Sequence, residues 1–447
     1  MTGAAGSISL WRDRDYRNYR VSRAVSLLGS HMSGLAFPLL VLGMGESAVK
    51  AGLLGTCAVV VGTLSKLPAG HLADRFDQKR LMLAMDAVRL AAVGSIPLAA
   101  ALGHLTFPQL VAVALVEGVA TAIFGSAAMV FVRVVVPPAQ FALAMSQSQR
   151  IFGIAALVGP MLGGALYAVD PFLPFVVDTV SYAVSGVLLL GVSARPGERG
   201  RGEDEPAGED RRVTAGLRWL AAHRGVLGLT AFCAVLNLVG AASGLAAVLV
   251  MSGQGVPSGV IGIVMACTGC GVVAGSLVVT RVMKLGPVRL YPAVGLLWAG
   301  SFGILSLSQS PWVMGACLTF MAALGPSASV MLFQLVAERS PRSMYGRVIA
   351  AQGLISTSLA FAGPLLAGVM VAWFGGTTVW LVFAGLCLAA TLVAIPSLIE
   401  AGRAAEPAET SEPAETLEPA ETAEPDVLAH DVRDPRTGPE TRHERRP

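Results

Sequence analysis

The sequence contains little charge. Only 14% of its 447 residues are Asp, Glu, Lys or Arg, whereas 54% are hydrophobic. A water-soluble chain of this length would need a far more polar surface, so the composition excludes an ordinary soluble protein. It indicates a chain whose surroundings are mostly lipid.

The sequence also lacks the local motifs of several enzyme classes. It has no GxxxxGK[ST] phosphate loop, no HExxH zinc motif and no GxSxG nucleophile turn. ATP hydrolysis, zinc hydrolysis and serine hydrolysis therefore lack their usual machinery. We expect a protein that is not an enzyme, that holds no cofactor or metal, and that draws its energy from an ion gradient.

Cysteines are few, and all six lie in apolar segments, which argues against a disulfide framework. The pair in "CTGC", Cys267 and Cys270, has redox or metal spacing but stands without a second pair or a nearby His. We interpret both as small packing residues within a membrane helix.

Long apolar segments are what the sequence has in abundance. Windows of roughly 20 apolar residues, enough to cross ~30 Å of hydrocarbon, recur twelve times. They lack the alternation of barrel strands, and backbone amides in lipid need internal partners, so we predict α-helices. The predicted spans are 24–44, 51–69, 81–102, 107–132, 148–169, 171–192, 225–251, 256–280, 288–308, 312–336, 348–372 and 376–398.

The chain consists of two similar halves. The stretch "SQRIFGIAALVGPMLGGAL" in span five aligns with "QGLISTSLAFAGPLLAGVM" in span eleven, so that Pro160 and Gly164 match Pro364 and Gly368. The predicted fold is an all-α integral membrane protein with two pseudo-symmetric six-helix bundles. The predicted parts are a first bundle (1–192), a linker (193–224), a second bundle (225–400) and a tail (401–447).

The linker and the tail have their own composition. The stretch 194–212 is polar and rich in Pro and Gly, which predicts a solvated linker. An amphipathic helix follows it, with Leu217, Trp219 and Leu220 expected to face lipid. The tail repeats "EPAET" and has few apolar residues, which predicts disorder.

Positive charge is distributed unevenly among the loops. If the N-terminus is cytoplasmic, nearly all loop arginines and lysines lie on the cytoplasmic side, and only Lys50 lies outside. The positive-inside rule then places both termini in the cytoplasm of a multi-pass protein of the cytoplasmic membrane. The first twenty residues have no apolar region ending in a cleavage site, so we predict no removable signal peptide.

Charge concentrates in the loop "PAGHLADRFDQKR" between spans two and three. With twelve spans in two halves, this loop resembles the signature of the major facilitator superfamily. The matching residues are Gly70, Asp74, Arg75, Lys79 and Arg80, and Asp77 stands where the superfamily usually has a second Gly. The "LADRFD" loop, the following Asp86-x-x-Arg89, and the stretches "VVVPPAQFALAMSQSQ", "VVDTVSYAVSG" and "YGRVIAAQ" resemble the siderophore-exporter and macrolide-efflux branch.

The loop is expected to act as a cytoplasmic gate. Gly70 permits close helix approach, and Asp74 is placed to accept from the N-terminal amides of a neighbouring helix or to pair with a cation. Such a latch would hold the two bundles together on the cytoplasmic side, and breaking it would let them rock. The alternative is a loop that only fixes orientation, which explains the basic residues but not Gly70 or Asp74.

Charged residues inside the spans are the candidate functional groups, because each costs at least ~2.5 kcal/mol at a helix centre. Glu117 in span four is the candidate proton-binding carboxylate, with a structural hydrogen bond as the alternative. Asp178 in span six is a second candidate carboxylate, for which a structural role is also open. Asp86 and Arg89 are one turn apart and are expected to pair with each other.

The motif "GPMLGG" in span five resembles one that the superfamily associates with antiporters. Its residues are Gly159, Pro160, Gly163 and Gly164, where the proline bends the helix and the glycines allow tight contact across the bundle interface. Two positions depart from the family pattern. Ala114 stands near Glu117 where the family has an Arg, and Ser30 stands where efflux relatives often have Asp.

The resemblance implies a secondary transporter that works by alternating access. We expect a monomer that exports a small amphipathic molecule in exchange for protons, with the lipid bilayer and no nucleic acid as its surroundings. One alternative is an importer or facilitator of the same fold without proton coupling. An alternative from another class is a membrane scaffold or sensor that acts through the tail.

Overall fold

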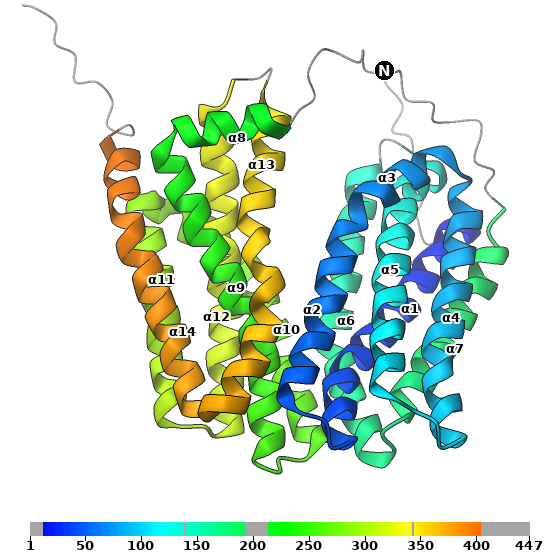
Figure 1. Cartoon of the computed structure of the whole chain (residues 1–447). Coiled ribbons are helices and arrows are strands. Elements are labelled where there is room, and N and C mark those ends of the chain that lie inside the picture. Colours follow the sequence, from blue (N-terminus) through cyan, green and yellow to red (C-terminus); the bar gives the residue numbers. More distant parts are fainter. Residues whose placement is uncertain (1–11, 138–139, 194–212, 342–343, 404–447) are drawn as a thin grey trace, which may run out of the picture. The chain divides into compact units, whose positions relative to one another are not determined.

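The computed structural model describes residues 12–137, 140–193, 213–341 and 344–403, and these parts are built from α-helices (Figure 1). The helices of the first half are α1 (Arg14–Gly43), α2 (Ala48–Leu64), α3 (Lys66–Arg75), α4 (Gln78–Ala101), α5 (Phe107–Val135), α6 (Phe141–Val169) and α7 (Leu173–Leu190). Those of the second half are α8 (Val213–Ala222), α9 (Arg224–Gly253), α10 (Ser258–Val282), α11 (Gly286–Leu307), α12 (Pro311–Arg339), α13 (Tyr345–Ser358) and α14 (Gly363–Arg403). The predicted linker 194–212 and the tail from 404 onward lie outside the described residues.

The described helices provide the twelve predicted crossings. Nine segments of the described residues are long and apolar enough to span a membrane, and two of these, Ser258–Leu307 and Tyr345–Glu400, have 50 and 56 residues, enough length for two spans each. The chain breaks at Gly375 inside α14, and α2 and α3 meet at a bend of 48° and are together long and apolar enough for one span. Large apolar side chains such as Leu307 lie exposed on the helices, as expected where the surrounding solvent is lipid.

Caps and turns define the helix ends. Asp13 caps α1 by accepting from the backbone amides of Asp15 and Tyr16, and Ser47 caps α2 through the amide of Lys50. The chain leaves α1 and α9 through Gly45 and Gly255, whose φ values of +79° and +74° favour glycine. These two turns occupy equivalent positions, so the two halves share local geometry as well as helix number.

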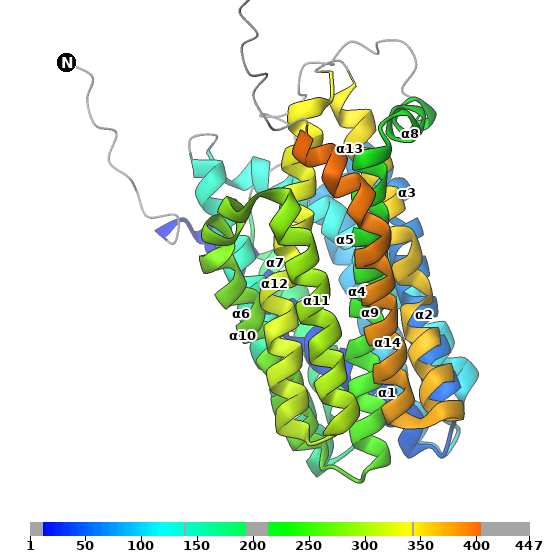
Figure 2. The same ribbon diagram turned by 90° about the vertical axis from the view of Figure 1, so that its left-hand side faces the viewer.

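The helices form two six-helix bundles that contact each other mainly along two helix pairs, and α1 also contacts α9. In the first bundle α1 packs on α6 and α7, and α4 packs on α5 and α7; in the second, α14 packs on α9 and α11. Across the interface α6 contacts α10 and α2 contacts α14, as Figures 1 and 2 together show.

Glycine lets the backbones approach closely at both contacts. A Cβ atom on Gly52 of α2 would lie 2.5 Å from the carbonyl oxygen of Pro364 and 3.1 Å from Cα of Gly368. On the other side, a Cβ atom on Gly262 of α10 would lie 2.5 Å from the carbonyl oxygen of Pro160. The aligned Pro and Gly residues of the two halves therefore make equivalent contacts with the opposite bundle.

One of these two contacts also contains a hydrogen bond. The backbone amide of Leu365, in the first turn of α14, donates to the Thr56 hydroxyl of α2 at 3.0 Å. Early helix amides have no partner within their own helix, so a side chain of the first bundle caps a helix of the second. The residue equivalent to Thr56 at the α6–α10 contact is Ala266, which offers no side-chain acceptor.

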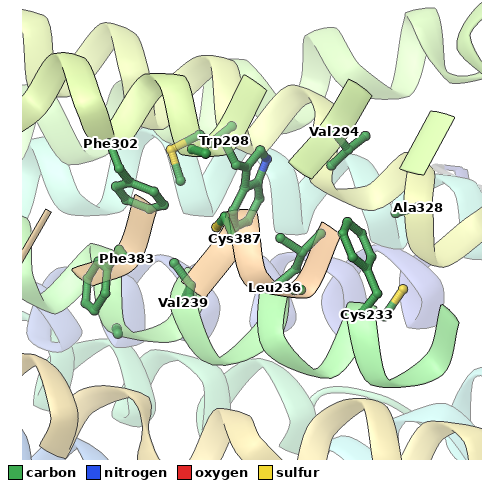
Figure 3. Packing of buried hydrophobic residues seen from close by; sticks show 14 of the residues in the cluster. Cys233, Leu236, Val239, Val294, Trp298, Phe302, Ala328, Phe383 and Cys387 are labelled. Atoms are coloured by element: carbon green, nitrogen blue, oxygen red, sulfur yellow. The ribbon is translucent and has the colours of Figure 1, made fainter. Parts of the chain in front are cut away.

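The second bundle has a large aromatic and aliphatic core. Figure 3 shows Trp298 and Phe302 of α11 beside Phe383 and Cys387 of α14, with Leu236 and Val239 of α9 facing them. The rings of Phe302 and Phe383 meet edge to face with centroids 5.5 Å apart. This bundle is thus held together mainly by apolar packing.

The helix after the linker exists, but one expectation about it is wrong. Leu220 of α8 is fully buried in the protein, and Leu217 and Trp219 pack against the same core cluster. The helix lies against α13, where Gly216 approaches the backbone of Arg347 (Figure 1). Its apolar face therefore packs on the second bundle and not on lipid, because α13 offers a closer apolar partner.

The cross-bundle cap predicts a conformational shift in Thr56→Val. The valine keeps the shape of the side chain but leaves the Leu365 amide without its acceptor, at a cost of about 1–3 kcal/mol. The closed α2–α14 contact should therefore lose at least about fivefold in population relative to conformations in which it is open. Double electron–electron resonance between spin labels at Lys50 and Trp373 measures this change.

Thr63→Val is the matched control, since Thr63 lies on the same helix, lines a cavity, and its substitution makes the same chemical change away from the Leu365 amide. Identical distance distributions in Thr56→Val and the parent chain would show that the cap does not hold this contact.

Candidate functional site

Buried charge in the described residues is confined to the first bundle. The charged side chains with no more than 3% exposure are Arg20, Asp86, Arg89 and Asp178, and all four lie on α1, α4 or α7. The buried polar residues of the second bundle are Ser, Thr and Gln. Charges at membrane depth are costly and are usually kept for function, so a functional site is expected in the first bundle.

The predicted gating loop is mostly helical. Gly70, Asp74 and Arg75 belong to α3, and Asp77, the departure from the family pattern, caps α4 by accepting from the Arg80 amide at 2.8 Å. A carboxylate at this position replaces glycine because it satisfies an otherwise unpaired helix amide.

The basic residues of this segment lie outside the core. Lys79 donates to the carbonyl oxygens of Leu190 and Val192 at the end of α7, where a positive charge is favourable. Arg75 and Arg80 are exposed. Asp74 is also exposed, and no hydrogen bond or ion pair joins it to another described residue. The latch therefore stays a prediction.

A cavity of about 880 Å³ is hollowed into the first bundle beside Asp74. Its wall comes mainly from α2, α3 and α5 and is largely apolar. Asp74 and Lys66 lie at one end, Phe37 and Leu54 at the other, and Glu117 lies on the wall between them. The cavity has the size and the sparse polar lining of a small-molecule site.

Glu117 connects to Asp178 through one hydroxyl group. Tyr182 of α7 places its hydroxyl oxygen 3.3 Å from Oε1 of Glu117 and 3.3 Å from Oδ2 of Asp178. The Ser30 hydroxyl lies 3.0 Å from the same oxygen. Three helices, α1, α5 and α7, thus meet at the Tyr182 hydroxyl, and two carboxyl groups share it.

Asp178 itself is closed off from solvent. Its side chain is fully buried and accepts from the hydroxyls of Ser33 (2.5 Å) and Ser181 (3.2 Å). Gly29 of α1 makes room for it, because a Cβ atom there would lie 2.4 Å from Oδ1 of Asp178. The surrounding hydroxyls satisfy this buried acceptor in the way that the low dielectric of a membrane interior requires.

Asp86 and Arg89 form an ion pair beside Tyr182. Arg89 donates to Oδ1 of Asp86 at 2.6 Å, and the Ser185 hydroxyl donates to Oδ2 at 2.7 Å. The Arg89 guanidinium also lies over the rings of Tyr182 and Phe124, at 4.6 and 4.3 Å from their centroids. The ion pair therefore packs against the same tyrosine that bridges the two carboxyl groups.

The "GPMLGG" residues lie between two helices and not at the charged cluster. A Cβ atom on Gly159 would meet His31, and one on Gly163 would lie 2.6 Å from the carbonyl oxygen of Met32, both on α1. Gly164 and Pro160 face α10. The motif lets α6 pack tightly on α1 of its own bundle and on α10 of the opposite bundle.

Several site residues were missing from the sequence-based prediction. Tyr182, Ser30 and Ser33 make the hydrogen bonds around the carboxyl groups, but none was a candidate. A signal for part of the set exists in "VVDTVSYAVSG", where Asp178, Ser181, Tyr182 and Ser185 follow the i, i+3, i+4, i+7 spacing of one helix face. A polar stripe along an otherwise apolar span marks a face that turns into the bundle.

No site for a metal is evident in the described residues. The cysteines are all free, and the residues that the structure describes contain no group of three His, Cys, Asp or Glu side chains placed to hold an ion. Cys267 is half-buried and Cys270 exposed on α10.

Two bundles of membrane-crossing helices, with buried charge and a cavity lined by charged residues in the first of them, define a polytopic membrane transporter. The family model of the Major Facilitator Superfamily matches residues 21–362 and again 227–435. The chain belongs to this superfamily.

Its curated relatives are distant. The chain is 25% identical over 393 residues to the multidrug efflux pump Tap of Mycobacterium tuberculosis, an alignment that covers 83% of this chain and 91% of that protein. It is also 25% identical over 346 residues to the uncharacterized MFS-type transporter YfiS of Bacillus subtilis, covering 75% and 81%.

Solved structures share the fold. A bacterial homologue of the iron transporter ferroportin in its inward-facing state has a TM-score of 0.68 at 16% identity, covering 86% of this chain and 98% of that one. A bacterial homologue of the lysosomal transporter Spinster, inward-facing and unoccupied, has a TM-score of 0.66 at 16% identity, covering 89% and 98%.

The packing around Asp178 predicts a specific sensitivity at Gly29. In Gly29→Ala the new methyl group must displace Asp178 or Ser181, and such overpacking costs about 1–3 kcal/mol. The thermal unfolding midpoint of the purified chain should therefore fall. Gly34→Ala is the matched control on the same helix, because a Cβ atom there has no neighbour within 4 Å. Equal midpoints for the two variants would contradict the close approach of α1 and α7 at Asp178.

Proposed function

We propose that this chain exports a small amphipathic molecule across the cytoplasmic membrane in exchange for protons. The observation that carries the proposal is the position of Glu117, whose carboxyl group lines an apolar cavity and contacts a second, buried carboxyl group through Tyr182. A carboxyl group in such a place can bind a proton or a substrate, and competition between the two is the simplest route to exchange.

The cavity suits an amphipathic substrate. Apolar side chains from α1, α2 and α5 offer contact to an apolar body, whereas Glu117, Thr121 and Ser126 offer a few polar contacts. The name of the mycobacterial relative, a multidrug efflux pump, supports export and a broad range of substrates.

The contacts between the bundles support alternating access. Gly52 and Gly262 lie in the first two turns of α2 and α10, and they bring the bundles together at the end of the helices that we assign to the outer face. Asp74 and Lys66 line the cavity toward the opposite end, which the positive-inside rule assigns to the cytoplasm. We therefore propose an inward-facing conformation, with both termini in the cytoplasm and a single chain as the transporting unit.

Glu117→Gln tests the coupling. Glutamine keeps the size of the side chain but cannot release a proton, so proton movement driven by ethidium in everted membrane vesicles should fall at least about tenfold. Exchange of ethidium across the membrane without a pH gradient should persist, because the cavity keeps its shape.

Glu46→Gln is the matched control, since it makes the same chemical change in the loop between α1 and α2, where Glu46 pairs with Lys50. Unchanged coupling in Glu117→Gln would remove this residue from the mechanism. If the parent chain moves ethidium without moving protons, the exchange mechanism is wrong and facilitated transport replaces it.

A further inference from the structure

We propose that Tyr182 relays a proton between Glu117 at the cavity wall and Asp178 in the core, so that the two carboxyl groups hold one proton in two alternative positions. The proposal rests on the proposed function, which it deepens by adding two residues to the proton path. Its basis is the geometry around a single hydroxyl group.

The Tyr182 hydroxyl has more acceptors around it than it has hydrogens to donate. The Tyr182 oxygen has three oxygen neighbours: Ser30 Oγ at 3.0 Å and the carboxyl oxygens of Glu117 and Asp178, each at 3.3 Å. Ser30 also lies 3.0 Å from the Ser26 carbonyl oxygen and can donate its hydrogen there. Tyr182 has one hydrogen to donate, so with both carboxyl groups ionised at least one carboxylate faces an oxygen lone pair.

One added proton removes this conflict. If Glu117 carries it, Glu117 donates to the Tyr182 oxygen and Tyr182 donates to Asp178. If Asp178 carries it, Asp178 donates to Tyr182 and Tyr182 donates to Glu117. Both arrangements pair every oxygen of the bridge, which an ionised pair does not achieve.

The charged neighbours agree with a single shared proton. Arg89 of α4 is the cation that faces the bridge, and its ion-pair partner Asp86 already neutralises it. Arg23 of α1 lies farther away, over the other ring that Arg89 contacts, that of Phe124. Full ionisation of both carboxyl groups would leave two charges around one hydroxyl at membrane depth.

Arg89 also has one buried donor without a hydrogen-bond partner. Its side chain is 3% exposed, yet its Nε atom has no hydrogen-bond partner. A buried donor left unpaired is costly.

The two carboxyl groups differ in access. Glu117 lines the cavity, whereas Asp178 is fully buried and lies five residues into α7, about 8 Å along the helix from its beginning. A proton that enters from the cavity therefore reaches Glu117 first. On Asp178 it is shielded from the cavity and is closer to the opposite face of the membrane.

The transfer from Glu117 to Asp178 conserves both protons and charge. The O–H bond of protonated Glu117 breaks as the proton binds the Tyr182 oxygen, and the original hydrogen of Tyr182 forms an O–H bond with Oδ2 of Asp178. Glu117 becomes a carboxylate, Asp178 becomes neutral, and the tyrosine hydroxyl is restored. No other reactant takes part.

Rapid-mixing infrared spectroscopy of the purified full chain in lipid nanodiscs tests the relay without substrate. A jump to lower pH should produce the carbonyl band of protonated Asp178, which the Asp178→Asn variant identifies by its loss. In Tyr182→Phe the ring under Arg89 remains, but the band should appear at least about tenfold more slowly. The band of Glu117, identified with Glu117→Gln, should keep its rate.

Ser30→Ala is the matched control, because it removes a contact to the same hydroxyl but leaves both carboxyl contacts. It should change the rate of the Asp178 band less than about twofold. Equal slowing in Ser30→Ala and Tyr182→Phe would indicate a general disturbance of packing and overturn the relay. An unchanged rate in Tyr182→Phe, or no titration of Asp178, would also overturn it.

These outcomes are separate from the fate of the proposed function. The infrared experiment measures no transport, and the ethidium experiment measures no transfer to Asp178. If the chain exports ethidium with proton coupling but the Asp178 band appears at the normal rate in Tyr182→Phe, the proposed function stands and the relay is wrong.

Discussion

The cost of placing charge at membrane depth is the constraint on which the first bundle depends. Three carboxyl groups and two arginines lie on α1, α4, α5 and α7, and each has a partner on another helix or one turn away. Gly29 permits α1 to approach Asp178, and the serines of α1 and α7 supply the hydroxyl groups that surround it. The helix packing and the polar network are therefore one arrangement, since neither the close approach nor the buried charge is stable without the other.

This constraint separates the roles of the two bundles. The described residues of the second bundle bury aromatic and aliphatic side chains and no charged one. The first bundle contains the charge and the cavity with Glu117. Between them, small residues at two equivalent contacts let backbones touch, and Thr56 strengthens one contact with a hydrogen bond. Two rigid bodies with weak, close-fitting contacts suit the rocking motion that alternating access needs.

The sequence predicted the architecture well, because span length and duplication are properties of the chain itself. It also predicted that Pro160 and Pro364 would be equivalent, and the structure places them at matching contacts. It did not predict that Glu117 meets Tyr182, because hydropathy does not reveal how far α5 and α7 are rotated about their axes. The lipid-facing orientation of α8 was wrong for a related reason: an amphipathic face packs equally well on lipid or on a neighbouring helix, and only the tertiary structure decides between them.

In the proposed mechanism, substrate and proton compete for the charged cluster of the first bundle. Calorimetric titration of the purified chain with ethidium, repeated in two buffers of different ionisation enthalpy, measures the protons released on binding. The account predicts that about one proton leaves per ethidium bound and that this release disappears in Glu117→Gln. Binding heats that are the same in both buffers for the parent chain would show that no proton is released and would contradict the account.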